Sequence, residues 1–402
     1  MESQPSQEPP ASPEDLPTSA TAPAQRVYAL LAAEPSGELM AAALVEQIRL
    51  REPNARFVGI GGRRMRAAGV ELWEDTSTWG TIGPFEVILR LPRIALAYLR
   101  LKRVLLQQRP DVTVMIDSPA LFMRIAKYTK AHGLRTVYYF PPSAWSDSER
   151  RAQAITARTT GVVCAFERQF RTYQRAGVPA QYFGHPMVDV VKRWTRDEAL
   201  ASLGLSPGRY VALLPGSRLA EVRIMTPIFV EAAKKLKAEF PDLSFLLPAA
   251  SDAVYKKLQV MLEGSGVMLF DGRTQELLAV SEVGIMTSGS VSLEAAYLNC
   301  PIVLGYRFNP LDAFFARTLV KLGLLKVPRF SLPNLILDED VVTELFQEQV
   351  TPERLTELAR GLLQGGDQRE RMLDDLHRVR EKLGQPPVVS QVADYVREVA
   401  GA

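Results

Sequence analysis

Short apolar segments alternate with amphipathic segments over most of this sequence, and this alternation restricts the fold more than any other feature. From Arg26 onward, the expected strands of a first series are 26–33, 56–62, 111–117, 136–140 and 161–166. Most of these segments are separated by patterns typical of helices. Short, apolar strands with intervening helices are typical of a parallel sheet that is covered by helices on both faces.

The same alternation starts again after residues 184–191. The expected strands of this second series are 209–218, which ends in a turn, then 243–250, 267–272, 283–289 and 301–306. From Pro352 onward the pattern is helical only. We therefore expect two doubly wound α/β domains that face each other across a cleft. The active site is expected in that cleft, at the carboxyl ends of the strands.

Composition supports this division and excludes several classes of protein. A chain of 402 residues is long enough for two domains, and a net charge of +3 does not suggest a nucleic-acid-binding protein. Three histidines exclude a His-rich metal site, and two cysteines argue against a disulfide scaffold and fit a reducing compartment. No apolar run is long enough to span a bilayer. Residues 1–25 are rich in Pro, Ser and Glu and lack the features of a secretory signal, so we expect a disordered tail and no export.

Two turns of the second series have the form of anion sites. The segment 287–290, Thr-Ser-Gly-Ser, ends a strand and precedes a helix that contains Glu294, and Pro215 to Arg218 does the same after the first strand of this series. Free N–H groups and a positive helix end favour anions at such turns, and the guanidinium fork of Arg218 can bind two phosphate oxygens. Two sites of this kind suit a nucleotide diphosphate, with Glu294 accepting hydrogen bonds from ribose. The plainer alternatives are that Ser290 caps its helix and that Arg218 pairs with Glu221.

The first series offers fewer chemical groups. Glu34 to Glu38, Glu-Pro-Ser-Gly-Glu, closes a strand and opens a helix; Ser36 is a candidate cap, and Gly37 allows a close approach to the backbone. Asp117 ends a buried strand, where it is either a general base or a helix cap. His185 lies between the two series and fits a hydrogen-bonding role at a hinge better than a catalytic role.

Two basic, amphipathic stretches, 85–109 and 314–330, have a composition that can lie on an anionic membrane. An ordinary surface helix with snorkelling cations is the alternative for each stretch.

Taken in order, these segments resemble the lipid-A-disaccharide synthase family of bacterial glycosyltransferases. The motifs that carry the resemblance lie between Ala32 and Leu345: AAEPSGE, FVGIGGRRMRAAGVE, IGPFEVI, PDVTVMIDSP, GHPMVD, ALLPGSRLAEV, TSGSVSLEAA, CPIVLGYRFNP and SLPNLI. The resemblance implies a GT-B fold, an α/β architecture of two Rossmann-like domains, with C-terminal helices that return toward the N-terminal domain. The resulting expected division is a tail at 1–25, an acceptor and membrane-facing domain at 26–187, a nucleotide-sugar domain at 188–359 and C-terminal helices at 360–402.

The resemblance also implies an activity and roles for individual residues. The family transfers a diacylglucosamine from UDP to a diacylglucosamine 1-phosphate and releases UDP, at the inner face of the cytoplasmic membrane. Asp117 matches the family's candidate base. The implied binding residues are Arg218, Ser288, Gly289, Ser290 and Glu294 for UDP, and Glu34, Ser36, Gly37, Glu86 and Asn334 for the rest of the cleft. No metal or other cofactor is required in this interpretation, because arginine and helix N-termini can offset the charge of the leaving UDP.

The sequence departs from the family pattern in its first half. Asp117 is followed by Ser-Pro-Ala-Leu-Phe, where the family usually has Ala-Pro-Asp-Phe-Asn, and the segment 138–148 lacks the family's His, second Trp and Arg. Alternatives therefore stay open: a relative with a different acceptor, an epimerase-like activity on a UDP-sugar, or a non-catalytic protein that binds nucleotide sugar or lipid. The sequence is also compatible with an oligomer.

Overall fold

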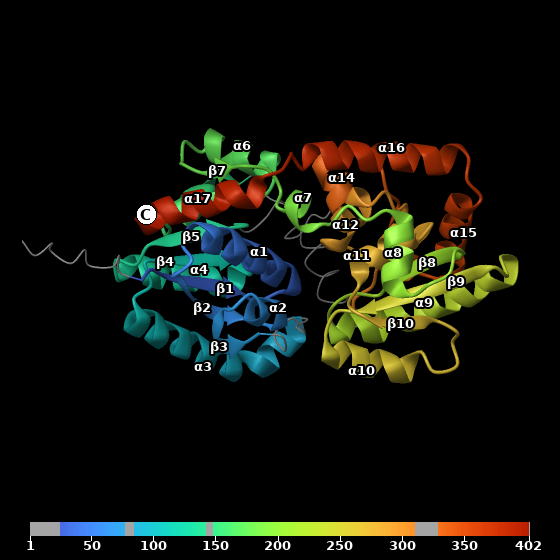
Figure 1. The fold of residues 1–402 in the computed structure, drawn as a ribbon, viewed down its shortest axis with the longest axis horizontal. Coiled ribbons are helices and arrows are strands. Elements are labelled where there is room, and N and C mark those ends of the chain that lie inside the picture. Colours follow the sequence, from blue (N-terminus) through green and yellow to red (C-terminus); the bar gives the residue numbers. More distant parts are fainter. Residues whose placement is uncertain (1–24, 77–83, 142–147, 310–328, 402) are drawn as a thin grey trace, which may run out of the picture.

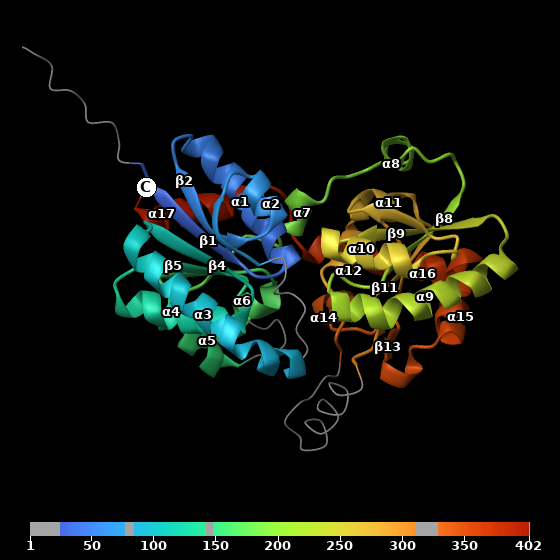
Figure 2. The same ribbon diagram turned by 90° about the horizontal axis from the view of Figure 1, so that it is seen from below.

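A computed structural model describes residues 25–76, 84–141, 148–309 and 329–401, although not the side chains of 84–94 and 119–120. The expected tail and most of the second basic stretch, 314–330, lie outside the described residues. The described part forms two halves, each built on one parallel sheet (Figures 1 and 2).

The first half contains a seven-stranded parallel sheet within the described residues, in the order β3-β2-β1-β4-β5-β6-β7. Its strands are β1 Val27–Ala32, β2 Arg56–Gly61, β3 Glu71–Asp75, β4 Val112–Ile116, β5 Thr136–Tyr139, β6 Gly161–Cys164 and β7 Gln181–Tyr182. Its helices are α1 Pro35–Arg51, α2 Arg63–Ala67, α3 Pro84–Gln108, α4 Pro119–Ala131, α5 Glu149–Thr156, α6 Glu167–Arg175 and α7 Met187–Val190. The sequence analysis did not predict β3, three of whose five residues are charged, or the two-residue β7.

The second half repeats this plan with a six-stranded parallel sheet in the described residues, in the order β10-β9-β8-β11-β12-β13. Its strands are β8 Arg209–Leu214, β9 Leu243–Ala249, β10 Met268–Asp271, β11 Val283–Met286, β12 Ile302–Tyr306 and β13 Glu344–Phe346. Its helices are α8 Arg196–Leu203, α9 Leu219–Glu239, α10 Asp252–Met261, α11 Thr274–Val280, α12 Val291–Tyr297, α14 Leu332–Leu337, the 3-10 turn η1 Gln347–Gln349, α15 Pro352–Leu363 and α16 Asp367–Lys382. The short β13 was not predicted.

Helices cover both faces of each sheet because successive strand residues point in opposite directions. Tyr28 and Leu30 of β1 pack in a cluster with α1 and α17, whereas Ala29 and Leu31 pack in another cluster with α3 and α4. This arrangement confirms the predicted pair of doubly wound, Rossmann-like domains of the GT-B type. None of the described helices is long and apolar enough to cross a membrane.

Within the described residues, the chain crosses between the halves twice, and the two crossings lie against each other. The first runs through Gly184 and His185 into α7, and the second leaves α16 at Leu383 and enters α17 (Val388–Ala400), which packs on α1 in the first half (Figure 1). The backbone N–H of His185 donates to the carbonyl of Leu383 at 2.7 Å. Gly184 has φ +109°, and a Cβ there would lie 2.9 Å from Val388. Of the expected C-terminal helices, α17 is the one that returns to the first half.

His185 is a structural residue of these crossings. It is buried, its ring lies 5.0 Å from the Phe166 ring and 5.3 Å from the Phe140 ring, and its Nδ1 accepts from the Met187 N–H at 3.1 Å. Burial lowers the pKa of His185 to about 3, so the ring is neutral near pH 7. This environment fits the expected hinge role.

Candidate active site

The carboxyl ends of the central strands of both sheets converge on one charged cluster. In each doubly wound sheet the strand order reverses direction at the central pair, which is β1 and β4 in the first half and β8 and β11 in the second. Ligands bind at this reversal point in such sheets. Glu34 follows β1, Asp117 follows β4, Arg218 follows β8 and Ser288 follows β11.

Arg218 joins the two halves through an ion pair. Its Nη2 lies 2.8 Å from Oε2 of Glu34, and its Nη1 lies 3.3 Å from Oε1 of Glu221. Burial opposes the charge of Arg218, but Glu34 and Glu221 hold its pKa above the ordinary value. The guanidinium is therefore a fixed cation at the end of β8. The expected pairing with Glu221 is present, and the pairing with Glu34 was not foreseen.

The turn that carries Arg218 depends on Gly216 and Glu221. Gly216 has φ +116°, and a Cβ there would lie 2.4 Å from Oε2 of Glu221. The same carboxylate accepts from the Arg218 N–H at 3.3 Å and from the Tyr306 hydroxyl at 3.1 Å. Glu221 and Tyr306 thus position the guanidinium, and neither had a signal in the sequence beyond the proximity of Glu221.

Asp117 lies on a constrained turn beside this ion pair. Asp117 and Ser118 both have positive φ, +57° and +47°, and the Tyr138 hydroxyl donates to the Asp117 carbonyl at 2.8 Å. Burial raises the pKa of the Asp117 carboxyl, Glu34 raises it further, and Arg218 opposes the shift. Strained backbone and a raised carboxyl pKa in a cleft are features of functional positions. Ser118, and not Asp117, occupies the cap position of α4.

Of the other first-half candidates, Glu34 is the cap residue of α1, although its side chain makes no cap hydrogen bond, and Ser36 lies inside the first turn. The close approach expected at Gly37 is made by the protein itself, since a Cβ there would lie 3.4 Å from Ala32 and 3.5 Å from Ile116. The expected cap at Ser36 is therefore corrected to Glu34. Glu86 lies in α3, and its side chain is outside the described residues.

The turn 287–290 leaves space for a ligand at its glycine. A Cβ on Gly289 would meet nothing within 4 Å, and Ser290 occupies the cap position of α12 without a cap hydrogen bond from its side chain. The Ser288 hydroxyl donates to the carbonyl of Phe330 at 2.9 Å, which ties this turn to the segment before α14. Ser288 therefore supports the turn, whereas Gly289 and Ser290 are open to a ligand.

Glu294 interacts electrostatically with a charged side chain of the first half, Arg64. Burial raises the pKa of Glu294 to about 7, while the charge of Arg64 and a hydrogen bond from Gln275 oppose the shift. Arg64 lies in the first turn of α2, and the buried Glu38 carboxylate accepts from the N–H groups of Arg64 and Gly62 at the start of this helix. Burial raises the pKa of Glu38, and these hydrogen bonds oppose the shift. Sequence reasoning missed Glu38 and Arg64, although both lie in the quoted motifs.

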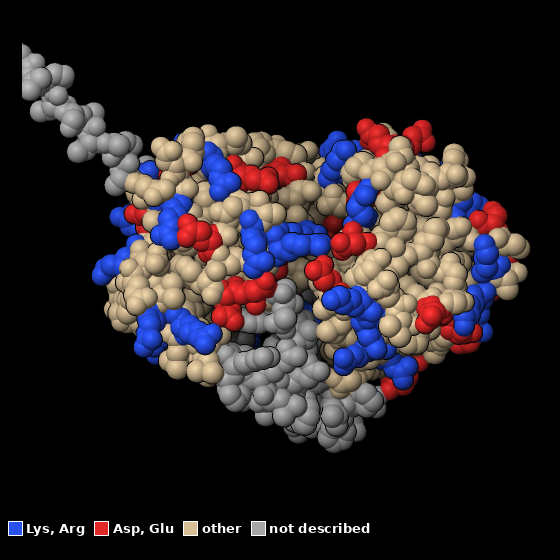
Figure 3. Space-filling view, turned by 60° about the horizontal axis from the view of Figure 1, so that its bottom comes forward, with Lys and Arg blue, Asp and Glu red and all other residues tan. Residues whose placement is uncertain are grey.

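Charged side chains of the two halves meet across the cleft (Figure 3). Besides the Arg218–Glu34 pair, Arg63 of α2 lies 3.3 Å from Asp252 and 3.5 Å from Asp271 of the second half. The described residues contain no group of three His, Cys, Asp or Glu that could hold a metal ion.

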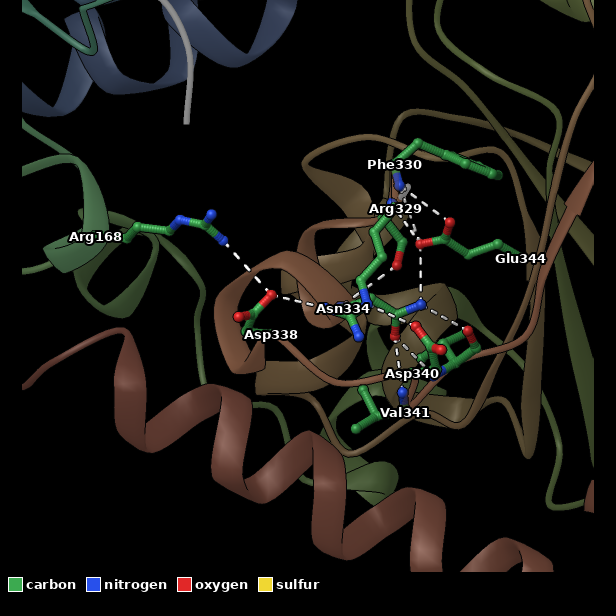
Figure 4. A network of polar contacts seen from close by, with 10 residues as sticks. Arg168, Arg329, Phe330, Asn334, Asp338, Asp340, Val341 and Glu344 are labelled. Atoms are coloured by element: carbon green, nitrogen blue, oxygen red, sulfur yellow. Dashed lines mark hydrogen bonds and ion pairs between the residues drawn. The ribbon is translucent and has the colours of Figure 1, made fainter. Parts of the chain in front are cut away.

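Asn334 lies in a buried network and not on the cleft surface (Figure 4). Its Nδ2 donates to the Val342 carbonyl at 2.8 Å and to Glu344 at 2.9 Å, and its Oδ1 accepts from the N–H groups of Val341 and Val342. These bonds occupy the donors and acceptors of the amide. The expected contact of Asn334 with a substrate is therefore replaced by a positioning role for α14.

Known proteins resemble this chain in sequence and in fold. A family model described as lipid-A-disaccharide synthetase matches residues 28–398. A lipid-A-disaccharide synthase of Geobacter sulfurreducens is 34% identical over 92% of this chain and 97% of its own length. Another, from Xanthomonas campestris, is 38% identical over 82% of this chain and 76% of its own length. Among solved structures, a UDP-GlcNAc 2-epimerase from Neisseria meningitidis bound to UDP-GlcNAc superposes with a TM-score of 0.62 at 11% identity, over 93% of this chain and 100% of its own.

Proposed function

Because the chain belongs to the lipid-A-disaccharide synthase family and is a glycosyltransferase of lipid A biosynthesis, we propose that its catalytic centre is the cluster of Asp117, Glu34 and Arg218. One observation carries this proposal. Asp117, whose carboxyl pKa is raised, and Arg218, which is ion-paired with Glu34, both lie where the strand order of their sheets reverses. Transfer of a sugar from a nucleotide requires a general base for the acceptor hydroxyl and a positive charge beside the leaving diphosphate. The carboxyl group of Asp117 on the first half and the guanidinium of Arg218 on the second half can supply these.

The proposed reaction is a single displacement. A hydroxyl of the acylated sugar phosphate acceptor gives its proton to Asp117, and its oxygen bonds to the anomeric carbon of the donor sugar. The bond from that carbon to the UDP oxygen breaks, and the developing charge on the diphosphate is stabilised by Arg218 and the turn 288–290. Glu294 is proposed to accept hydrogen bonds from the ribose hydroxyls. Attack opposite to the leaving group inverts the anomeric configuration.

The donor and acceptor follow from the family. We infer UDP-diacylglucosamine as the donor and diacylglucosamine 1-phosphate as the acceptor. The retained Arg218 and 287–290 turns support the donor. The altered segments after Asp117 and at 138–148 lie on the acceptor side, and residues 142–147 of the latter are outside the described residues.

Purified protein in detergent should release UDP from UDP-diacylglucosamine only when diacylglucosamine 1-phosphate is present. Equal amounts of UDP and acylated disaccharide are expected, measured by a coupled UDP assay and by mass spectrometry of the lipid. UDP release or sugar epimerisation without the acceptor would favour the epimerase-like alternative suggested by the fold of the 2-epimerases. Donor binding without either product would favour a non-catalytic protein.

We also propose that the protein binds the inner face of the cytoplasmic membrane as a peripheral protein, where acylated substrates reside. Helix α3 supports this proposal: Leu96 and Leu99 are 57% and 58% exposed, and Arg100 and Arg103 are exposed beside them. Exposed apolar side chains flanked by cations suit an anionic bilayer surface. The free cysteines Cys164 and Cys300 are both buried, which fits a reducing compartment.

Replacing Leu96 and Leu99 by serine should weaken binding to vesicles of phosphatidylglycerol and phosphatidylcholine about tenfold, because less apolar surface can enter the bilayer. Cosedimentation measures this partition. Leu50→Ser is the matched control, since Leu50 is 74% exposed on α1, which covers the other face of the sheet. Unchanged binding of the α3 variant would remove α3 from the membrane contact.

A further inference from the structure

A second basic site lies between the two halves, away from the charged cluster of Glu34, Asp117 and Arg218. It is a cavity of about 390 Å³ between α6 of the first half and α14 of the second, and it reaches Lys382 at the end of α16. Two carboxylates line it, Glu167 and Asp338. Four cationic side chains also line it: Arg168, Arg171, Arg175 and Lys382. The cavity therefore has an excess of positive charge, and anions are favoured there.

The three arginines of this cavity make ion pairs with exposed or half-exposed carboxylates. Arg171 pairs with Glu167 at 2.6 Å within α6, and Arg168 lies 3.6 Å from Asp338, an exposed carboxylate that Arg329 already contacts at 2.6 Å (Figure 4). Arg175 lies 3.8 Å from Glu149. Exposed pairs of this kind contribute little and can be exchanged for a stronger anionic partner such as a phosphate.

The opposite wall is apolar, and its helix is hydrogen-bonded to its own half. Leu332, Leu335 and Ile336 of α14 face the cavity, while Asn334 on the same helix is bonded to Val342 and Glu344. This anchoring fixes the helix at the cavity wall. A cationic wall opposite an apolar wall suits a molecule with a phosphate next to acyl chains.

The cavity is linked to both sides of the catalytic cleft. Helix α6 follows β6, which is two strands from β4 and Asp117 in the sheet, a separation of about 10 Å at the usual strand spacing. Helix α14 begins next to Phe330, whose carbonyl accepts from the Ser288 hydroxyl of the donor turn. A phosphorylated sugar together with an arginine side chain can span this separation.

We propose that this cavity binds the phosphate of the acylated sugar phosphate acceptor and thereby orients the attacking hydroxyl toward Asp117. The inference rests on the proposed function, and it names a subsite for one of the two substrates. The acceptor is the better occupant than the donor diphosphate, because Arg218 and the turn 288–290 already form an anion site at the other central strands. The cavity joins the two halves, so acceptor binding also favours their approach.

The test is a double variant, Arg168→Gln with Lys382→Gln, in the full-length protein. The KM for diacylglucosamine 1-phosphate should rise at least tenfold, because two cations that contact its phosphate are lost. The dissociation constant of UDP and the KM of the donor should not change. Turnover of an acceptor analogue without the phosphate should be the same in wild type and variant, which a merely structural effect would not produce.

The matched control is Arg150→Gln with Lys234→Gln, which removes two exposed cations outside the cavity, one from each half. Weaker UDP binding in the cavity variant would assign the cavity to the donor and overturn the proposal. An unchanged KM for the phosphorylated acceptor would overturn it as well. If the wild type itself shows no acceptor-dependent UDP release, the proposed function has failed, and the subsite falls with it.

Discussion

Asp117→Asn is expected to lower kcat by about two to four orders of magnitude, the usual contribution of a general base. Asparagine has nearly the same shape but cannot accept the proton of the acceptor hydroxyl. The dissociation constant of UDP should stay within about twofold of the wild-type value, because the anion site belongs to the other half. Steady-state kinetics together with titration calorimetry of UDP separate the two effects.

The pH dependence of kcat is an independent test of Asp117 as the general base. Burial and the neighbouring Glu34 raise the pKa of Asp117, so the active, deprotonated form is lost at a higher pH than for an ordinary aspartate. In the wild type kcat should fall as the pH decreases through this raised pKa, and the asparagine variant should lack that limb.

Asp111→Asn is the matched control for this change. Asp111 precedes the opposite end of β4, is exposed, and accepts from the Val27 N–H at 2.7 Å. Its replacement should leave kcat unchanged. Near-normal turnover of Asp117→Asn, with a normal control, would reject the role of base and leave Asp117 as a residue of the turn.

Much of the fold could be predicted from the sequence because its strands are buried on both faces. The segments 210–214 and 283–286 carry no charged residue, and the strands predicted within 209–218 and 283–289 are present as β8 and β11. Strands at the edges of the sheets, such as β3 and β13, are partly exposed and mixed in composition, so periodicity does not distinguish them from loops. The long helix α9 was also expected, although it contains Pro227.

The candidate site was predictable in its parts but not in its contacts. The positions of Asp117 and Arg218 could be predicted, because a charged side chain that follows a buried strand must lie at the carboxyl end of that strand. The pairing of Arg218 with Glu34 joins residues 184 positions apart in the sequence, and only the approach of the two halves creates it. Asn334 shows the converse, since the amide of a family-like motif is hydrogen-bonded to the backbone of Val341 and Val342 and to the Glu344 carboxylate, all in its own half.

Arg218→Ala should weaken UDP binding by about 10- to 100-fold, because charge-assisted hydrogen bonds contribute about 1.5–3 kcal/mol. Arg218→Lys should recover only part of this loss, since lysine keeps the charge but lacks the planar fork that binds two oxygens. Arg209→Ala is the control at the start of the same strand, where Arg209 pairs with Glu282 at 2.8 Å, and its UDP affinity should be normal.

The ion pair between Glu34 and Arg218 affects how the change in UDP affinity of Arg218→Ala is interpreted. The carboxylate of Glu34 lies 2.8 Å from the guanidinium of Arg218, so a diphosphate must compete with it for the same donors. Glu34→Gln should therefore leave UDP affinity unchanged or make it tighter, whereas Arg218→Ala should weaken it. In a protein that already carries Arg218→Ala, adding Glu34→Gln should not change UDP affinity further. Such non-additivity is expected only if the two side chains act as one unit. If Glu34→Gln weakens UDP binding as much as Arg218→Ala does, Glu34 orients the arginine for the nucleotide and does not compete with it.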